Sequence, residues 1–170
     1  MFVEKLRAAT ESNNSYLCVG LDPDRERMPH RDVVPFLRDI IEATKDLVCA
    51  YKPNFAFFEA LGTEGMQTLL ESMANVPADI PIIADAKRGD IGNSARFYAD
   101  AIFGEYGFDA VTVNGYGGRD AVQPFLDYDG SAMQKAVEPE AVRSELDAIL
   151  AFGSRFPGEP GFLRCEEYVR

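Results

Sequence analysis

The sequence predicts an α/β fold with a parallel sheet, and three observations point to it. Four apolar runs have the length and composition of strands that are buried on both faces. Each run ends in polar residues, and a stretch with the apolar spacing of a helix follows it. The polar ends, Asp22, Lys52, Asp85 and Asn114, lie 30, 33 and 29 residues apart, which is the length of a βαβ unit with a right-handed crossover.

Local patterns predict the individual elements. Pro35 suits the first turn of a helix, and Gly62 and Gly65 interrupt a second helical region. Asn93 or Ser94 is expected to cap the helix that follows Gly92. In chain order we expect a helix over 2–11, a strand over 15–21, a helix over 34–46, a strand over 47–51, a helical region over 55–74, a strand from 82, a helix through 95–99, a strand over 108–113 and a C-terminal helix over 139–152.

Charged residues gather in the stretch over 81–100, PIIADAKRGDIGNSARFYAD. The run Ile82-Ile83-Ala84 is typical of a buried strand, and Asp85, Lys87 and Asp90 are expected where that strand emerges into a loop. Asp85 and Lys87 are two residues apart, so on an extended chain their side chains point to the same side. An isolated pair with this spacing is about as often a structural ion pair as part of a functional site.

The strand ends favour the functional interpretation. In a parallel sheet every strand delivers its carboxyl end to one rim, and binding and catalytic residues collect there. Five charges on one rim are hard to explain as solvated surface residues, so we interpret them as a functional site. The five residues are Asp22, Lys52, Asp85, Lys87 and Asp90.

Composition limits the classes of function. The 170 residues suffice for one core, and the net charge of −11 argues against a nucleic-acid-binding surface. No apolar run approaches the roughly 20 residues of a membrane span, and the N-terminus lacks the apolar segment of a secretory signal. Cys18, Cys49 and Cys165 are expected to be buried free thiols in a reducing cytoplasm. A single histidine, His30, leaves little for a histidine-based triad or metal site.

The charged motifs resemble the orotidine 5′-phosphate decarboxylase family, most closely its longer bacterial subgroup. Three segments carry the resemblance in the expected order: VGLDPD at 19–24, YKPNFAFFE at 51–59, and Asp85-x-Lys87-x-x-Asp90-Ile91-Gly92. The resemblance extends to about Asp127. It implies a (β/α)8 TIM barrel, here a partial barrel of about four βα units over 1–128. Residues 129–170 would then form a divergent region with the C-terminal helix and a Pro/Gly-rich tail.

The resemblance also implies an activity and a set of roles. The activity is decarboxylation of orotidine 5′-phosphate to UMP in pyrimidine biosynthesis, without a cofactor or metal, by a cytoplasmic homodimer. Lys87 would donate a proton to C6 of the pyrimidine, Asp85 would lie against the substrate carboxylate, and Lys52 would hold Asp85 and the ribose. The resemblance implies that Lys52, Asp85, Lys87 and Asp90 form an alternating catalytic network. The implied substrate-binding residues are Asp22 at a ribose hydroxyl, Asn114 near the base, Ile91 and Ser94, and Asp90 and Ser94 would reach the partner subunit's site.

Elementary chemistry agrees with these roles. Decarboxylation without a cofactor leaves a carbanion that has no neighbouring carbonyl to take up its charge. A fixed ammonium group stabilises that carbanion and can then transfer its proton to it. A carboxylate beside the lysine keeps the lysine charged and in place.

Two alternatives stay open. Related sugar-phosphate decarboxylases and synthases share D-x-K-x-x-D and usually use magnesium. A truncated paralogue would bind a nucleotide or a partner subunit without catalysis, because the family's later strands, glycine-rich phosphate loop and phosphate-binding arginine are not recognisable. Arg119 and Arg155 are weak substitutes for that arginine, and Arg88 and Arg96 are interpreted as solvated surface charges.

Overall fold

The computed structural model describes residues 2–29 and 31–128 of the chain. Strands and helices alternate there in the predicted order, and the predicted helix over 139–152 lies outside the described residues, as does the region over 129–170. The elements are α1 (Phe2–Asn13), β1 (Cys18–Leu21), α2 (Val33–Thr44), β2 (Ala50–Pro53), α3 (Phe55–Glu59), η1 (Gly62–Glu64), α4 (Gly65–Met73), β3 (Ile83–Arg88), α5 (Gly92–Ala99), η2 (Asp100–Glu105), β4 (Ala110–Val113), η3 (Gly115–Gly117) and α6 (Arg119–Leu126).

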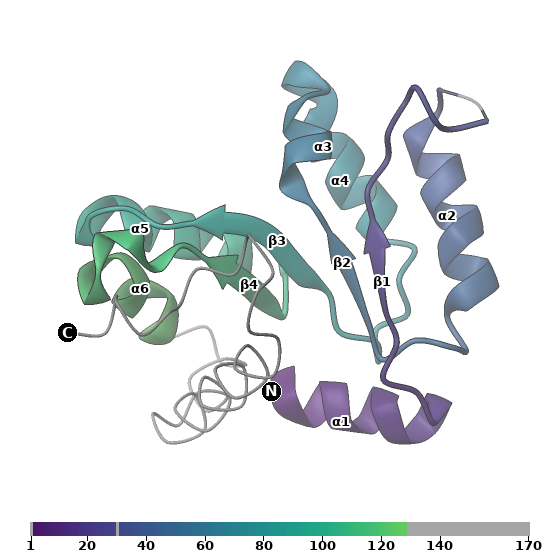
Figure 1. Cartoon of the computed structure of the whole chain (residues 1–170), viewed down its shortest axis with the longest axis horizontal. Coiled ribbons are helices and arrows are strands. Elements are labelled where there is room, and N and C mark those ends of the chain that lie inside the picture. The colour runs from purple at the N-terminus through teal and green to yellow at the C-terminus, as the bar shows by residue number, and fades with distance from the viewer. Residues whose placement is uncertain (1, 30, 129–170) are drawn as a thin grey trace, which may run out of the picture. The chain divides into compact units, whose positions relative to one another are not determined.

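The four strands are parallel, as predicted. β1 pairs with β2, and β3 pairs with β4 (Figure 1). Two isolated bridges, Tyr51 to Ile82 and Asn54 to Asp85, place β2 beside β3. The spatial order is therefore β1-β2-β3-β4, and the described residues form a partial (β/α) barrel whose strands all deliver their carboxyl ends to one rim.

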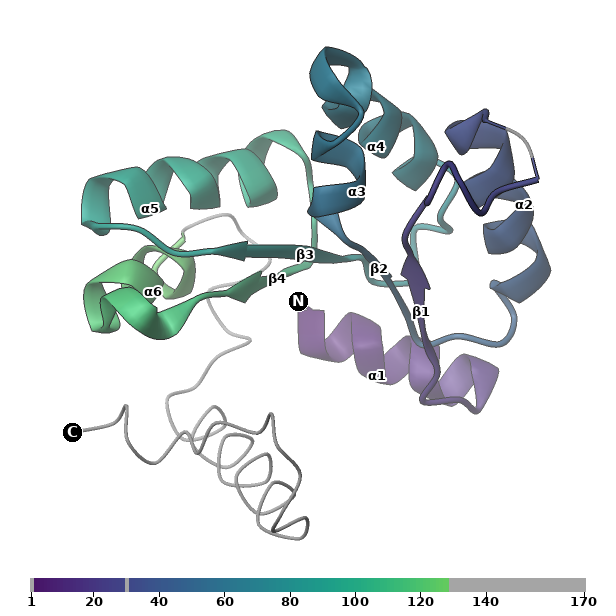
Figure 2. The ribbon, with the colours of Figure 1, turned by 45° about the horizontal axis from the view of Figure 1, so that its top comes forward.

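Helices pack against the strands (Figure 2), and apolar side chains form the core between them. Leu37 and Ile41 of α2, Phe58 of α3 and Leu69 of α4 are all at most 1% exposed. Burial of each such side chain contributes about 2 kcal/mol of hydrophobic free energy. The ring of Tyr51 in β2 is equally buried, and its hydroxyl donates a hydrogen bond of 3.1 Å to the carbonyl of Ile41. This core fixes β2 and thereby the position of the residues at its carboxyl end.

The amino ends of the strands are closed by α1 (Figures 1 and 2). Lys5 of α1 forms an ion pair of 2.8 Å with Asp109, just before β4. The same Asp109 oxygen accepts a hydrogen bond of 2.8 Å from the backbone N–H of Ile82, just before β3. The charges at this end of the sheet therefore join elements of the fold, whereas the opposite rim carries the candidate site.

All four strands begin later than predicted, β3 by one residue and the other three by two or three residues. Tyr16 and Leu17 are 90% and 50% exposed and precede β1, and Leu47 is 57% exposed and precedes β2. The carbonyl of Leu17 already accepts a hydrogen bond of 2.8 Å from the backbone N–H of Cys49, and the regular pairing of β1 with β2 begins one residue later, at Cys18. The apolar character of Tyr16 and Leu47 did not indicate strand pairing. Asp109 precedes β4 because it caps the amino ends of β3 and β4.

The start of α5 also differs from the prediction. Asn93 and Ser94 do not cap the helix, because it already begins at Gly92 with Ile91 in the N-cap position and no side-chain cap. The Asp90 carboxylate instead accepts a hydrogen bond of 2.7 Å from the backbone N–H of Ile91. The helix then widens into a π-helical turn over Asp100–Glu105.

None of the helices within 2–29 and 31–128 combines the length and the apolar character needed to cross a membrane.

Candidate active site

Asp85 is the buried centre of the charged group on β3. The residue is 8% exposed, and both of its carboxylate oxygens have partners. Oδ2 lies 2.8 Å from Lys87 Nζ and 3.1 Å from Lys52 Nζ. Oδ1 accepts a hydrogen bond of 2.8 Å from the hydroxyl of Thr112 in β4. We call Lys52, Asp85 and Lys87 the lysine–aspartate cluster; the structure brings these three predicted residues together.

The pKa of the Asp85 carboxyl reflects these contacts. Burial would raise it, because desolvation disfavours the charged form. Hydrogen bonds from Lys87, Thr112 and Lys52 outweigh that effect and lower the pKa to about 2. Asp85 is therefore ionised at neutral pH, and two ammonium groups share one carboxylate. The cluster is a local cationic site in a chain with a net charge of −11, and it can attract an anionic ligand.

Lys87 reaches Asp85 through an irregular backbone. Its φ is 49°, in the left-handed region that a residue with a Cβ rarely adopts. The pairing of β3 with β4 shifts register between Ala84 and Arg88. The predicted same-side placement of Asp85 and Lys87 is confirmed, but both residues lie inside β3 and not in the loop after it. The Lys87 side chain is 62% exposed, so its ammonium group is open to a ligand.

Thr112 is a site residue that the sequence analysis missed. Its hydroxyl oxygen donates to Asp85 and accepts a hydrogen bond of 3.1 Å from the backbone N–H of Lys87. The available signal was a threonine inside the otherwise apolar strand AVTV, Ala110–Val113. That signal alone does not say which neighbour the hydroxyl contacts.

Asp22 lies at the end of β1, next to the cluster. Its Oδ1 accepts a hydrogen bond of 3.3 Å from the backbone N–H of Asn54, and Asn54 forms the bridge to Asp85. The Asp22 side chain is exposed on the predicted rim.

Asn114 follows β4 on the same rim. Its backbone N–H donates to the carbonyl of Arg88 at 2.6 Å, which ties the end of β4 to the end of β3. Its side-chain oxygen accepts a hydrogen bond of 3.0 Å from the backbone N–H of Tyr116 and caps the short helix η3. Its predicted position near a base stays a prediction.

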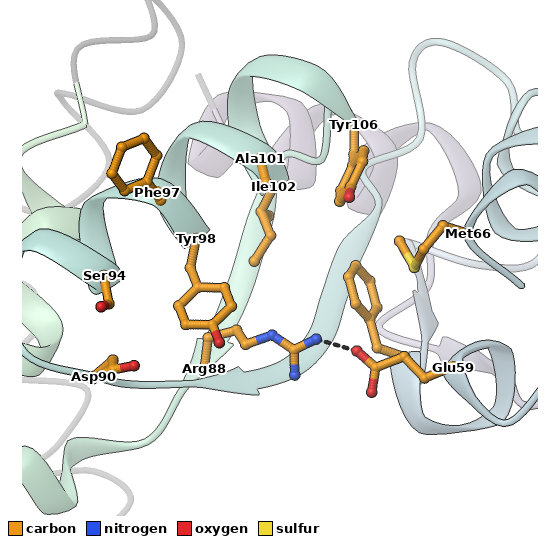
Figure 3. A pocket seen from close by; sticks show the side chains of 11 residues that line it. Glu59, Met66, Arg88, Asp90, Ser94, Phe97, Tyr98, Ala101, Ile102 and Tyr106 are labelled. Carbon is orange, nitrogen blue, oxygen red and sulfur yellow. Dashed lines mark hydrogen bonds and ion pairs between the residues drawn. The ribbon is translucent and has the colours of Figure 1, made fainter. Parts of the chain in front are cut away.

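Asp90, Ile91 and Ser94 are not part of the cluster within this chain. Among the described residues the Asp90 carboxylate forms no ion pair, and Ile91 is 75% exposed. Asp90 and Ser94 line a cavity of about 490 Å³ beside α5 (Figure 3). The residues around this cavity are Phe55, Glu59, Met66, Arg88, Asp90, Ser94, Phe97, Tyr98, Ala101, Ile102 and Tyr106.

The interpretation of Arg88 as a solvated surface charge is wrong. Its side chain is 26% exposed and forms an ion pair with Glu59 of α3, which Figure 3 shows within the cavity. The guanidinium carbon lies 5.8 Å from the ring centroid of Phe55 and 5.4 Å from that of Tyr98. Arg96, by contrast, is exposed as predicted and pairs with Asp100 on the surface of the helix.

The other predicted candidates add nothing to the cluster. Arg119 is exposed and donates to Gln123, and Arg155 and Cys165 lie outside the described residues. Cys49 is a buried free thiol, but Cys18 is exposed, contrary to the prediction, because it stands at the start of β1. Within 2–29 and 31–128 no three His, Cys, Asp or Glu side chains group closely enough to hold a metal ion.

Comparison with known proteins finds a family match over the site-bearing part of the chain. Residues 15–138 match the model of the "Orotidine 5'-phosphate decarboxylase / HUMPS family". Proteins named orotidine 5′-phosphate decarboxylase from Herpetosiphon aurantiacus and Dehalococcoides mccartyi are 55% and 51% identical over 133 and 128 residues. Each match covers 75% of this chain, but 50% and 47% of the relative. The chain therefore spans about half the length of these relatives.

Solved structures give the same result. The structure of Leishmania donovani OMP decarboxylase matches with a TM-score of 0.67 and 41% sequence identity. The match covers 75% of this chain and 49% of that one. This chain therefore resembles these proteins in its fold as well as in its sequence motifs.

Proposed function

Because the chain belongs to the orotidine 5′-phosphate decarboxylase / HUMPS family, we propose that it carries the charged half of an active site that converts orotidine 5′-phosphate to UMP. The observation that carries the proposal is the sharing of one Asp85 oxygen by two ammonium groups, at 2.8 and 3.1 Å. This arrangement holds a lysine charged, positioned and exposed at the rim where a substrate arrives.

Each member of the cluster has a distinct task in this reaction. Lys87 stabilises the developing carbanion and protonates it at C6 as carbon dioxide leaves, because preorganised charge stabilises a transition state without reorganisation. Asp85, ionised at neutral pH with a pKa of about 2, keeps Lys87 in place and lies against the substrate carboxylate. Lys52 holds Asp85 from the neighbouring strand. In the same proposal Lys52 and Asp22 bind the ribose, and Asn114 lies near the base.

The active form in this proposal is a homodimer in a cytoplasmic setting. Asp90, which precedes α5, and Ser94 of α5 line the cavity, and the side chains of Ile91 and Phe97 are exposed. A partner copy on this face would receive Asp90 and Ser94, with Ile91, at its own substrate site. The free thiol of Cys49 suits a reducing compartment.

The test is turnover of orotidine 5′-phosphate by the purified 170-residue chain, followed as loss of pyrimidine absorbance. We expect turnover that does not change when EDTA is added, and a decrease of about 1,000-fold or more in K87A, since general acid and electrostatic catalysis are both lost. K45A is the matched control, because Lys45 pairs with Glu42 on the surface of α2.

Four outcomes would contradict the proposal. Absence of turnover by the intact chain would reject the activity. Equal turnover by wild type and K87A would reject the role of Lys87. Loss of turnover with EDTA would favour a magnesium-dependent relative. Binding of UMP without turnover would point to the non-catalytic paralogue.

A further inference from the structure

The Thr112 hydroxyl makes two hydrogen bonds whose directions are fixed by its partners. An ionised carboxylate can only accept a hydrogen bond, and a backbone N–H can only donate one. The single hydroxyl proton of Thr112 therefore points to Asp85 Oδ1, at 2.8 Å, and an oxygen lone pair receives the N–H of Lys87, at 3.1 Å. No other orientation of the hydroxyl satisfies both contacts.

The two bonded groups belong to the proton donor and its counter-ion. Lys87 stands at a φ of 49°, a left-handed conformation that is strained for a residue with a Cβ and needs support from its surroundings. The Lys87 ammonium binds Asp85 on Oδ2, while Thr112 holds the same carboxylate on Oδ1. The Thr112 hydroxyl thus contacts both the backbone of Lys87 and the carboxylate of Asp85, the ion-pair partner of Lys87.

The position of Thr112 is fixed from the neighbouring strand. Its neighbours in β4 are in register with β3 on both sides of the irregular segment, Val111 with Ala84 and Val113 with Arg88. The hydroxyl oxygen is thereby held opposite the residues between those two pairs, which include Asp85 and Lys87.

We propose that Thr112 is a positioning residue of this site: one hydroxyl fixes the Asp85 carboxylate and the irregular backbone of Lys87 together. The inference rests on the proposed function for its effect on turnover, but its effect on Asp85 is independent of that function. A threonine that served only as a β-branched strand former would be replaced by valine without consequence, since valine has the same shape and high strand propensity.

The experiment compares T112V, which removes the hydroxyl, with T112S, which retains it. The matched control is T68V, because Thr68 donates to the carbonyl of Glu64 on the exposed surface of α4. In assays with orotidine 5′-phosphate we expect kcat to fall about 10- to 100-fold in T112V, with a smaller change in KM, since lost positioning acts on the transition state. T112S is expected to recover most of the loss, and T68V to match wild type.

A second measurement does not depend on catalysis. The pKa of the Asp85 carboxyl is followed by carbon-detected NMR between pH 2 and 6 in each protein. We expect it to rise in T112V, because a hydrogen bond to the charged form is lost, and to stay near the wild-type value in T112S and T68V.

The outcomes separate this inference from the proposed function. If the wild-type chain has no turnover but the Asp85 pKa rises in T112V alone, the activity fails and the positioning role stands. If wild type turns over and T112V keeps both its kcat and its Asp85 pKa, the positioning role is overturned. If T112V and T112A both fail to fold while T112S folds, the hydroxyl serves the fold alone, and that result also overturns the inference.

Discussion

Lys87 and Arg88 are consecutive cations at the end of β3, yet the structure holds them in opposite ways. Lys87 shares Asp85 with Lys52 and is 62% exposed. Arg88 has a carboxylate of its own, that of Glu59, and is 26% exposed beneath aromatic rings. The cluster around Lys87 therefore keeps an excess of positive charge, whereas the Arg88–Glu59 pair is neutral.

This difference separates a reactive cation from a structural one. A cation in excess at an open rim remains available to an anionic ligand. The neutral Arg88–Glu59 pair joins α3 to β3, and Arg88 also donates a hydrogen bond of 3.0 Å to the carbonyl of Ala86. That bond passes across Lys87, so the structural cation helps to hold the backbone conformation of the reactive one.

The largest loss of stability is expected from a substitution of Gly89, because it would disturb both the lysine–aspartate cluster and the Arg88–Glu59 pair. A Cβ at this position would overlap the carbonyl oxygen of Asn114, the residue whose backbone N–H ties the end of β4 to β3. We expect G89A to lose about 2–3 kcal/mol of unfolding free energy through overpacking, measured by urea denaturation, together with most of any turnover. G92A is the matched control, because a Cβ there meets nothing within 4 Å. Equal stability of G89A and G92A would contradict this prediction.

The next largest loss of stability is expected when the Asp85 carboxylate of the lysine–aspartate cluster is removed, and this loss depends on pH. The pKa of Asp85 is lowered from 3.8 to about 2 in the folded chain. A lowered pKa contributes stability that is complete above about pH 4 and disappears as the pH falls through 2. The contribution is about 2 kcal/mol. The unfolding free energy of wild type, measured by urea denaturation, should therefore exceed that of D85N by about that much less at pH 2 than at pH 5.

A surface variant controls for the change of one charge. Asp39 pairs with Arg38 on α2 with a side chain that is 69% exposed. The difference between wild type and D39N should vary much less over the same pH range, because exposed pairs contribute at most about 1 kcal/mol. A D85N difference that is independent of pH would show that the two lysines do not stabilise the Asp85 carboxylate.

The parts of this molecule that sequence predicted are those set by local periodicity. The spacing of Asp22, Lys52, Asp85 and Asn114 predicted the parallel strands, because the length of a βαβ unit is constrained by its crossover. The two-residue spacing of Asp85 and Lys87 predicted their contact. The first inference uses the regular spacing of the strand ends along the sequence, and the second uses two residues that are close in sequence.

The parts that sequence did not predict depend on register and on packing between distant elements. Thr112 meets Asp85 because β4 lies beside β3 in one register, and 27 residues separate the two. Arg88 meets Glu59 across 29 residues because α3 packs near the end of β3. Residue type alone could not distinguish half-buried Arg88 from exposed Arg96, since both are arginines of the same charged stretch over 81–100.

The smallest expected effect tests whether the Arg88–Glu59 pair is structural. E59Q removes the carboxylate and leaves the half-buried guanidinium over Phe55 and Tyr98 without a counter-ion. We expect a loss of roughly 1 kcal/mol in urea denaturation, between the values typical of exposed and buried pairs, because the stacked rings retain part of the interaction. The pKa of Asp85 should not change.

D100N provides the matched comparison, because it breaks the exposed Arg96–Asp100 pair, whose nitrogen and oxygen lie 3.3 Å apart. D100N should lose less than about 0.5 kcal/mol of unfolding free energy. If E59Q loses no more than D100N, the neutral pair has no structural role and the contrast with Lys87 fails. If E59Q instead lowers turnover while stability is unchanged, Arg88 acts on Lys87 through the Ala86 carbonyl, and the structural and reactive cations form one unit.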